Sequence, residues 1–208
     1  MVTEIRIYLE GGGDRSESRA ALRQGFSRFL QSLHDLARAK GSGVRVVLCG
    51  PRQQAYRDFQ AALRTNPEAL NVLLVDSEEP VSAGSPREHL RKRSQDGWHL
   101  DNVAEEKCHL MVQAVEAWLI ADPDTLATYY GQGFLRSALP KADDVETVDK
   151  SRLHSALAHA TEKTRKKRYH KIRHCSDLLA RIDPKLVRQR ARHCDRLFAV
   201  LEETIETL

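Results

Sequence analysis

The sequence predicts an α/β fold with an open, mainly parallel sheet flanked by helices. Three apolar runs of strand length, residues 5–9, 44–49 and 71–75, are separated by two stretches with helical periodicity. The connections between these segments are short. Strands that are joined by short helical crossovers pair in parallel with a right-handed connection, so the alternation predicts the sheet.

The first predicted strand carries a glutamate, Glu10, into Gly11-Gly12-Gly13-Asp14. Residues 17–40 follow as one predicted helix, because apolar residues recur there at spacings of three and four. A Gly-Ser-Gly turn ends that helix, and a Gly-Pro pair after the second strand opens the next one. The third strand then runs directly into Asp76.

The later part of the chain is predicted to be mostly helical. Residues 81–103 are polar and rich in Ser, Gly, Pro and Arg, which favours a long surface loop. Residues 109–113 are predicted as a fourth strand, and Asp122 before a proline as a helix N-cap. From about Val145 the apolar pattern is helical to the end.

The length of 208 residues fits one domain, or one domain with an appendage. We predict an α/β domain over residues 1–144 and a helical extension over residues 145–208 that packs on the same domain. Apolar residues make up 41% and charged residues 30%, as in soluble globular proteins. No apolar run approaches the roughly 20 residues that cross a bilayer, and the N-terminus lacks a secretory signal pattern. We therefore expect a cytoplasmic protein with no membrane partner.

The four cysteines are scattered and form no C-x-x-C pair, which argues against a disulfide framework. The dipeptides His174-Cys175 and His193-Cys194 supply ligand types for zinc. Adjacent residues on a helix point in different directions, however, so helix-surface and core positions are the favoured interpretation.

Positive charge is concentrated in residues 161–196, which hold thirteen basic residues against four acidic ones. Such asymmetry is typical of nucleic-acid binding, since phosphate contacts dominate the affinity. The alternative is a solvated helical face beside an acidic domain. The candidate nucleic-acid contacts are Lys163, Arg165, Lys166, Lys167, Arg168 and Arg173.

Acidic residues follow the predicted strands. Glu10 follows the first strand, Asp76 and Glu78 follow the third, and Glu116 lies near the fourth. The carboxyl ends of parallel strands lie at one edge of a sheet, so these carboxylates should converge. A hard cation relieves their repulsion. We therefore predict that these four acids hold Mg²⁺ or Mn²⁺, and that Lys171 stabilises charge developing on a phosphoryl group.

Each acidic position also has a structural interpretation. Glu10 alone fits a turn or capping residue, Glu79 a solvated charge, and Glu116 the partner of an arginine. Glycines after a first strand also occur at dinucleotide sites, but neither G-x-G-x-x-G nor a P-loop pattern is present.

Several sequence blocks resemble a bacterial toprim-like family that is catalogued as a domain of unknown function. They are the Glu10-Gly11-Gly12-Gly13-Asp14 block, Asp76-x-Glu78, HLMVQAVEAWLIAD over residues 109–122, YHKIRH over residues 169–174, and the tail blocks 182–184 and 193–197. The resemblance implies a toprim-type α/β sheet, as in topoisomerases, primases and overcoming-lysogenization-defect nucleases, which use Mg²⁺. By position it places Glu10 at the toprim glutamate and Asp76 with Glu78 at the paired-acid motif. That motif is usually Asp-x-Asp, so Glu78 departs from it.

Relatives of this kind are often encoded beside an ATPase in phage-defence loci, where the toprim partner cuts DNA or tRNA. The resemblance therefore implies a Mg²⁺-dependent nuclease that acts on DNA or tRNA together with an ATPase partner protein, and a homo-oligomer stays open. Two alternatives also stay open: a catalytically silent toprim-like subunit that binds and regulates an ATPase, and a nucleic-acid-binding module without chemistry.

Overall fold

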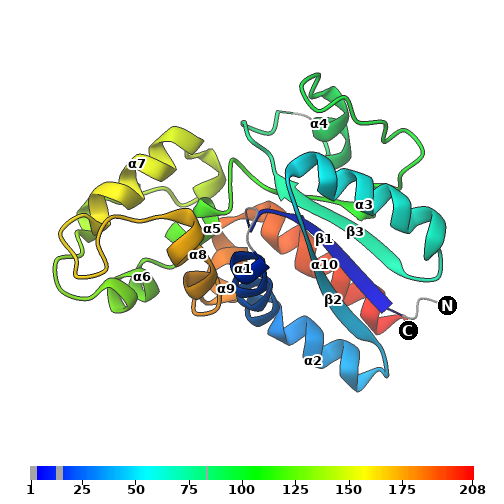
Figure 1. Ribbon diagram of the computed structural model, residues 1–208, viewed down its shortest axis with the longest axis horizontal. Coiled ribbons are helices and arrows are strands. Elements are labelled where there is room, and N and C mark those ends of the chain that lie inside the picture. Colours follow the sequence, from blue (N-terminus) through cyan, green and yellow to red (C-terminus); the bar gives the residue numbers. More distant parts are fainter. Residues whose placement is uncertain (1–3, 13–15, 83) are drawn as a thin grey trace.

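The computed structural model describes residues 4–12, 16–82 and 84–208, and it is an α/β protein (Figure 1). Its sheet has the strand order β2-β1-β3-β4, and every pairing is parallel. The strands are β1 (Glu4–Glu10), β2 (Gly43–Gly50), β3 (Leu70–Asp76) and β4 (Cys108–Met111). This arrangement confirms the predicted fold class, an open parallel sheet flanked by helices.

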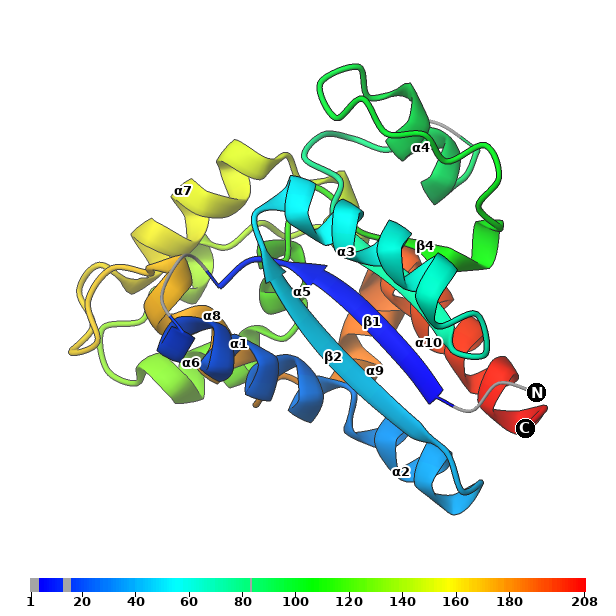
Figure 2. The same ribbon diagram turned by 45° about the vertical axis from the view of Figure 1, so that its right-hand side comes forward.

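Helices cover both faces of the sheet (Figures 1 and 2). One face packs against α1 (Ser16–Phe29), α2 (Gln31–Ala39) and α10 (Arg192–Glu206), and the other against α3 (Arg52–Thr65) and α4 (Pro86–Lys92). Along β3, Val72 and Leu74 enter the first core while Leu73 and Val75 enter the second. A strand that is buried on both faces has apolar residues pointing to each of them, which explains the apolar run over residues 72–75.

The remaining helices gather beyond the carboxyl ends of the strands (Figure 1). They are α5 (Glu116–Ile120), α6 (Pro123–Tyr130), α7 (Lys150–Thr161), α8 (Lys171–Leu179) and α9 (Pro184–Arg190), with short 3₁₀ turns at Glu105–Lys107, Arg136–Ala138 and Val145–Thr147. Asp122 Oδ1 accepts a hydrogen bond from Thr125 N at 3.0 Å, which confirms the predicted N-cap of α6. Among the described helices, none combines the length and apolarity needed to cross a membrane.

Two local predictions are wrong. The helix expected over residues 17–40 is two helices, because the chain turns at Leu30, whose side chain is fully buried between them. The loop expected over residues 81–103 contains α4 and buries Leu90 and Trp98 in the second core. Ser85 caps α4 by accepting a hydrogen bond from Glu88 N, and this Ser-Pro-x-Glu capping signal is present in the sequence.

Candidate functional site

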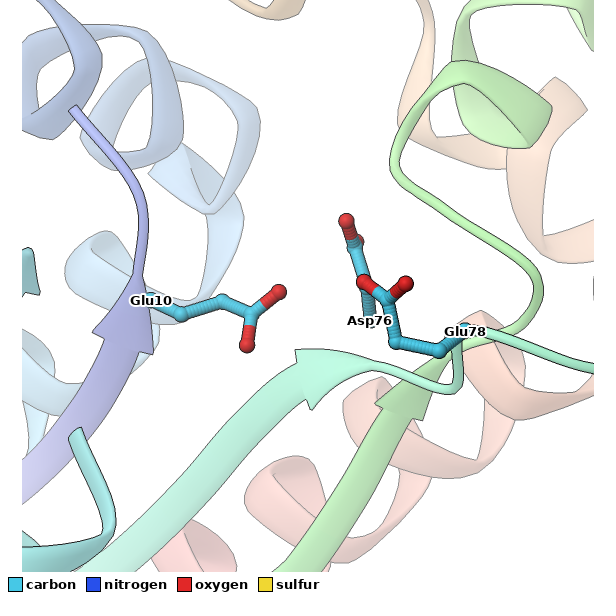
Figure 3. A group of neighbouring side chains, drawn as sticks. All are labelled: Glu10, Asp76 and Glu78. Atoms are coloured by element: carbon cyan, nitrogen blue, oxygen red, sulfur yellow. The ribbon is translucent and has the colours of Figure 1, made fainter. Parts of the chain in front are cut away.

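Three carboxylates meet at the carboxyl edge of the sheet. Glu10 ends β1, Asp76 ends the adjacent β3, and Glu78 follows in the next turn. One ligand oxygen from each lies within 4.8 Å of the others, and Glu10 reaches across toward the other two (Figure 3). Parallel pairing of β1 with β3 therefore brings together three of the four acids that the sequence singles out. Gly13 and Asp14 of the predicted glycine turn lie outside the described residues.

Backbone irregularities aim two of these side chains. The register between β1 and β2 shifts after Leu9, so that Glu10 pairs with Gly50, and Gly11 N donates to Gly50 O at 2.7 Å. Glu78 has a φ of 67°, in the left-handed region that non-glycine residues rarely adopt. Gln113 (φ 62°) lies opposite and accepts a hydrogen bond from Glu78 N at 3.2 Å. Such strain clusters at functional sites, where the surrounding structure maintains it.

A different basic side chain contacts each of the three carboxylates. Arg52 Nη1 lies 3.0 Å from Glu10 Oε2, and Lys150 Nζ lies 2.5 Å from Glu78 Oε2. Lys171 Nζ lies 3.1 Å from Asp76 Oδ2, while Asp76 Oδ1 accepts a hydrogen bond from a backbone N–H. The acidic group is therefore held by charges from three separate helices.

Arg52 is itself anchored away from the carboxylates. Its Nε and Nη2 donate to the two oxygens of the Asp96 carboxylate at 3.0 and 2.9 Å. Its Nη1 also donates to the backbone oxygen of Asp76 at 2.6 Å, and its guanidinium lies 4.7 Å from the Trp98 ring centroid. The segment between α4 and β4 thus acts on Glu10 through Arg52.

Burial makes the ionised forms of Glu10 and Asp76 costly, even with a basic side chain beside each of them. Burial, reinforced by the charge of Asp76, raises the pKa of Glu10 to about 7 against the opposing effect of Arg52. Burial also raises the pKa of Asp76, although Lys171 opposes the change. Deprotonation of both acids is therefore costly until more positive charge arrives, and three oxygen donors suit a hard divalent cation.

Glu116 belongs to a second layer of the site. It is fully buried, and its Oε2 lies 3.5 Å from Lys171 Nζ. Its Oε1 accepts a hydrogen bond from Tyr169 Oη at 3.0 Å and lies 3.6 Å from His154 Nε2. Burial raises its pKa, but His154 and Lys171 outweigh that effect and hold the pKa at about 2. Glu116 is thus an ionised partner of Lys171, not of an arginine, and it stands outside the group of three acids.

A cleft of about 800 Å³ opens over these side chains. Its lining includes Glu10, Asp76, Glu116 and Lys171 from the charged network, together with residues of α1, α7 and α8. The α1 helix passes close to α8, because a Cβ on Gly25 would lie 2.5 Å from Ser176 O. This close crossing brings Lys171, the first residue of α8, up to the carboxylates.

The basic segment divides into two groups. The exposed bases Lys163, Arg165, Lys166, Lys167 and Arg168 lie in the loop between α7 and α8, where Arg168 lines the cleft, and Arg173 is exposed on α8.

Other bases in the segment hold the structure together. Arg190 donates to the carbonyls of Ile120, Ala121 and Ala142, Arg188 pairs with Asp195 and Glu202, and Arg196 donates to Cys108 O. The excess of basic residues over residues 161–196 therefore has two sources: an exposed basic loop, and arginines that pair with groups inside the protein.

The histidine-cysteine dipeptides lie in structural positions. His174 Nδ1 contacts Tyr130 Oη at 3.0 Å, His193 pairs with Glu146 at 2.7 Å, and both cysteines are buried. Within the described residues, the group that could share a metal ion is Glu10, Asp76 and Glu78.

Sequence reasoning missed Arg52, Asp96, Lys150 and His154. Arg52 directly follows the Gly-Pro pair after β2, which was an available signal, since a residue there lies at the same sheet edge as Glu10. Lys150 and His154 come from a helix far along the chain, and only the tertiary packing shows their role.

Comparison with known proteins identifies a family. The family described as "Domain of unknown function (DUF4276)" matches residues 9–202, nearly the whole chain. No curated protein matches. No solved structure matches either. The match includes Glu10, Asp76, Glu78, Glu116 and Lys171, so the site described above lies within the shared domain. The chain therefore belongs to the family defined by the domain of unknown function DUF4276.

Proposed function

We propose that this protein is a Mg²⁺-dependent nuclease that hydrolyses phosphodiester bonds in DNA or tRNA. The observation that carries the proposal is the convergence of Glu10, Asp76 and Glu78 to within 4.8 Å beside a cleft. Arg168 lines that cleft, and the exposed basic loop to which it belongs supplies charge for binding a polyanion.

The roles follow from the positions of the side chains. Glu10, Asp76 and Glu78 would hold Mg²⁺ or Mn²⁺, which would supply Lewis acidity toward a phosphoryl oxygen. Lys171, at the same site, offsets negative charge that develops on the phosphorus centre. Glu116 positions the ammonium group of Lys171 and is assigned to that role in preference to metal binding. Arg168 and the bases of the loop bind neighbouring phosphates.

The resemblance of the sequence blocks to toprim effectors supports a biological setting. In that setting the protein is the effector subunit of an ATPase-linked anti-phage system, and its partner restrains or triggers cleavage. This part of the proposal rests on the sequence resemblance alone, so it is tested by co-purification with an ATPase encoded beside the gene.

A cleavage assay together with calorimetry tests the nuclease proposal. We expect purified protein to cut DNA or tRNA with Mg²⁺ or Mn²⁺ but not in EDTA, and expect Glu10→Gln and Asp76→Asn to abolish the cut. Glu68→Gln is the matched control, because Glu68 is exposed near the start of β3, at the opposite edge of the sheet. If a partner restrains cleavage, the isolated protein should still bind Mn²⁺ through these acids, and titration calorimetry measures this binding. Unchanged Mn²⁺ binding in both site variants would refute the metal site.

A second candidate is the catalytically silent subunit that regulates an ATPase. One observation favours it: Glu10, Asp76 and Glu78 each contact a basic side chain of the protein, so the network is partly neutralised without a metal ion. The calorimetry separates the two functions, because a silent scaffold binds no Mn²⁺ through these acids while still binding its partner.

A further inference from the structure

The lining of the cleft combines charged and apolar side chains. Beside the carboxylates and Lys171 it includes Leu22 and Phe26 from α1 and Ile172 from α8. Ile172 is 56% exposed, although large hydrophobic side chains are costly to leave in water. A purely ionic ligand, such as a phosphate or a carboxylate, would make no use of these apolar side chains.

Flat rings also line the cleft. His154, Tyr169 and His170 all contribute to the lining, and Arg168 stands beside them. The Tyr169 ring is fixed, because its hydroxyl donates to the buried Glu116. The His170 side chain is exposed and makes no capping hydrogen bond to α8. Rings and guanidinium planes of this kind are the surfaces on which nucleobases stack.

We infer that the cleft takes an unpaired nucleotide, with its phosphate at Lys171 and its base against the rings and Ile172. The inference rests on the proposed function and narrows its substrate to a single-stranded or looped polynucleotide. A base inside a duplex is stacked and paired, so it reaches such a surface only after leaving the helix. The cleft volume, about 800 Å³, lies within the range of about 300–1,000 Å³ that is typical of sites for small ligands, and is too small to enclose a duplex.

Binding of labelled oligonucleotides in EDTA tests this inference without relying on cleavage. One sequence is prepared in single-stranded, fully paired and internally looped forms, as DNA and as RNA, and affinity is measured by fluorescence anisotropy. We expect the single-stranded and looped forms to bind about tenfold more tightly than the duplex, which corresponds to roughly 1.4 kcal/mol of base stacking. Comparing the affinities of the DNA and RNA series shows which of the two nucleic acids the cleft prefers.

Two variants and one control locate the preference in the cleft. Ile172→Asp and His170→Ala should each reduce the preference for unpaired forms while leaving thermal unfolding unchanged, because both side chains are exposed. Leu186→Asp is the control, since Leu186 is also an exposed apolar residue but lies on α9 outside the cleft. Equal affinity for all three forms would overturn the inference, as would equal effects of Ile172→Asp and Leu186→Asp. A protein that cuts but shows no preference refutes the inference alone, and one that prefers unpaired strands but neither cuts nor binds Mn²⁺ refutes only the nuclease.

Discussion

Lys171 Nζ lies 3.1 Å from Asp76 Oδ2, joining the first residue of α8 to the last residue of β3 across 95 positions of sequence. The same ammonium lies 3.5 Å from Glu116 Oε2. Burial lowers the pKa of Lys171, but the charges of Asp76 and Glu116 outweigh it, so the net pKa is raised and the residue stays cationic. One side chain therefore links the group of three acids, through Asp76, to the buried Glu116 behind it.

Replacing Lys171 with methionine should destabilise the protein and abolish cleavage. Two buried carboxylates would lose their shared cation, and we expect a loss of about 1–3 kcal/mol in the free energy of unfolding. This figure is below that of a fully buried pair, because Lys171 is 45% exposed and water screens it. Urea denaturation measures the effect, with Lys185→Met, an exposed lysine of α9, as the control. Equal denaturation midpoints for the two variants would contradict the role of Lys171 as the shared cation of Asp76 and Glu116.

The pH dependence of stability should report on Glu10. Its pKa is about 7 in the folded protein and about 4.5 in the unfolded chain, so between those values the folded state holds a proton that the unfolded state has released. Stability therefore falls as the pH rises from about 4.5 to 7, and Asp76 acts in the same direction because its pKa is also raised.

Thermal unfolding in EDTA across this pH range checks the expectation. Glu10→Gln removes the contribution of Glu10 to this dependence, so it should stabilise the protein above pH 7 and have little effect near pH 4.5. Adding Mn²⁺ should restore stability to the wild type at high pH, since a ligand that binds the folded state stabilises it. If the stability of the wild type stays constant from pH 4.5 to 7, then the pKa of Glu10 is not raised in the folded protein.

Arg52 should be irreplaceable even by lysine. Its fork contacts Asp96 through two nitrogens while Nη1 reaches Glu10, and a lysine ammonium cannot reproduce that planar geometry. We expect Arg52→Lys to cost roughly 2–4 kcal/mol of stability, because it breaks largely buried ion pairs. Faster proteolysis between residues 81 and 103 should accompany the loss. Arg57→Lys, exposed on the same helix, is the control, and equal proteolysis rates in the two variants would contradict this role.

The main architecture and the acid triad were predictable because they depend on local pattern and topology. Alternation of apolar runs with helical stretches fixes the parallel sheet, and parallel strands place Glu10 and Asp76 at one edge. The turn at Leu30 was not predictable, since the apolar spacing continues through it without glycine or proline.

The cations of the site were harder to predict than its acids. Lys171 was identified among many similar bases, but Lys150 and Arg52 were not, because a lysine or arginine at a helix start is ordinary on a solvated surface. Their role depends on which helix ends pack over the sheet edge. The same limit applies to the basic segment, where sequence shows the charge of Arg190 but not the three carbonyls that bind it.

Exposed loop bases and internal arginines should respond differently to substitution. Replacing Lys163, Arg165 and Lys167 together with glutamine should weaken binding to any polynucleotide and reduce the slope of log affinity against log salt by about one per lost phosphate contact. Thermal unfolding should not change, because these side chains are exposed. Arg190→Gln is the counterpart: it should lower stability by about 1–3 kcal/mol, since it leaves carbonyls without their donor, and it should leave the salt slope unchanged. The reverse pattern would show that Arg190 and its neighbours form the nucleic-acid surface.

Gly25 should control the position of Lys171 from a distance. Alanine normally stabilises a helix interior by about 0.5–1 kcal/mol relative to glycine, but a Cβ here would lie 2.5 Å from Ser176 O, a backbone atom that cannot move alone. We expect Gly25→Ala to force α1 and α8 apart and to lower stability by about 1–3 kcal/mol, as in overpacked cores. It should also reduce cleavage, although Gly25 lines no part of the cleft. Gly43→Ala is the matched control, because a Cβ on Gly43 meets nothing within 4 Å. If the Gly25 variant keeps wild-type activity with reduced stability, then the crossing of α1 and α8 supports the fold without setting the geometry of the site.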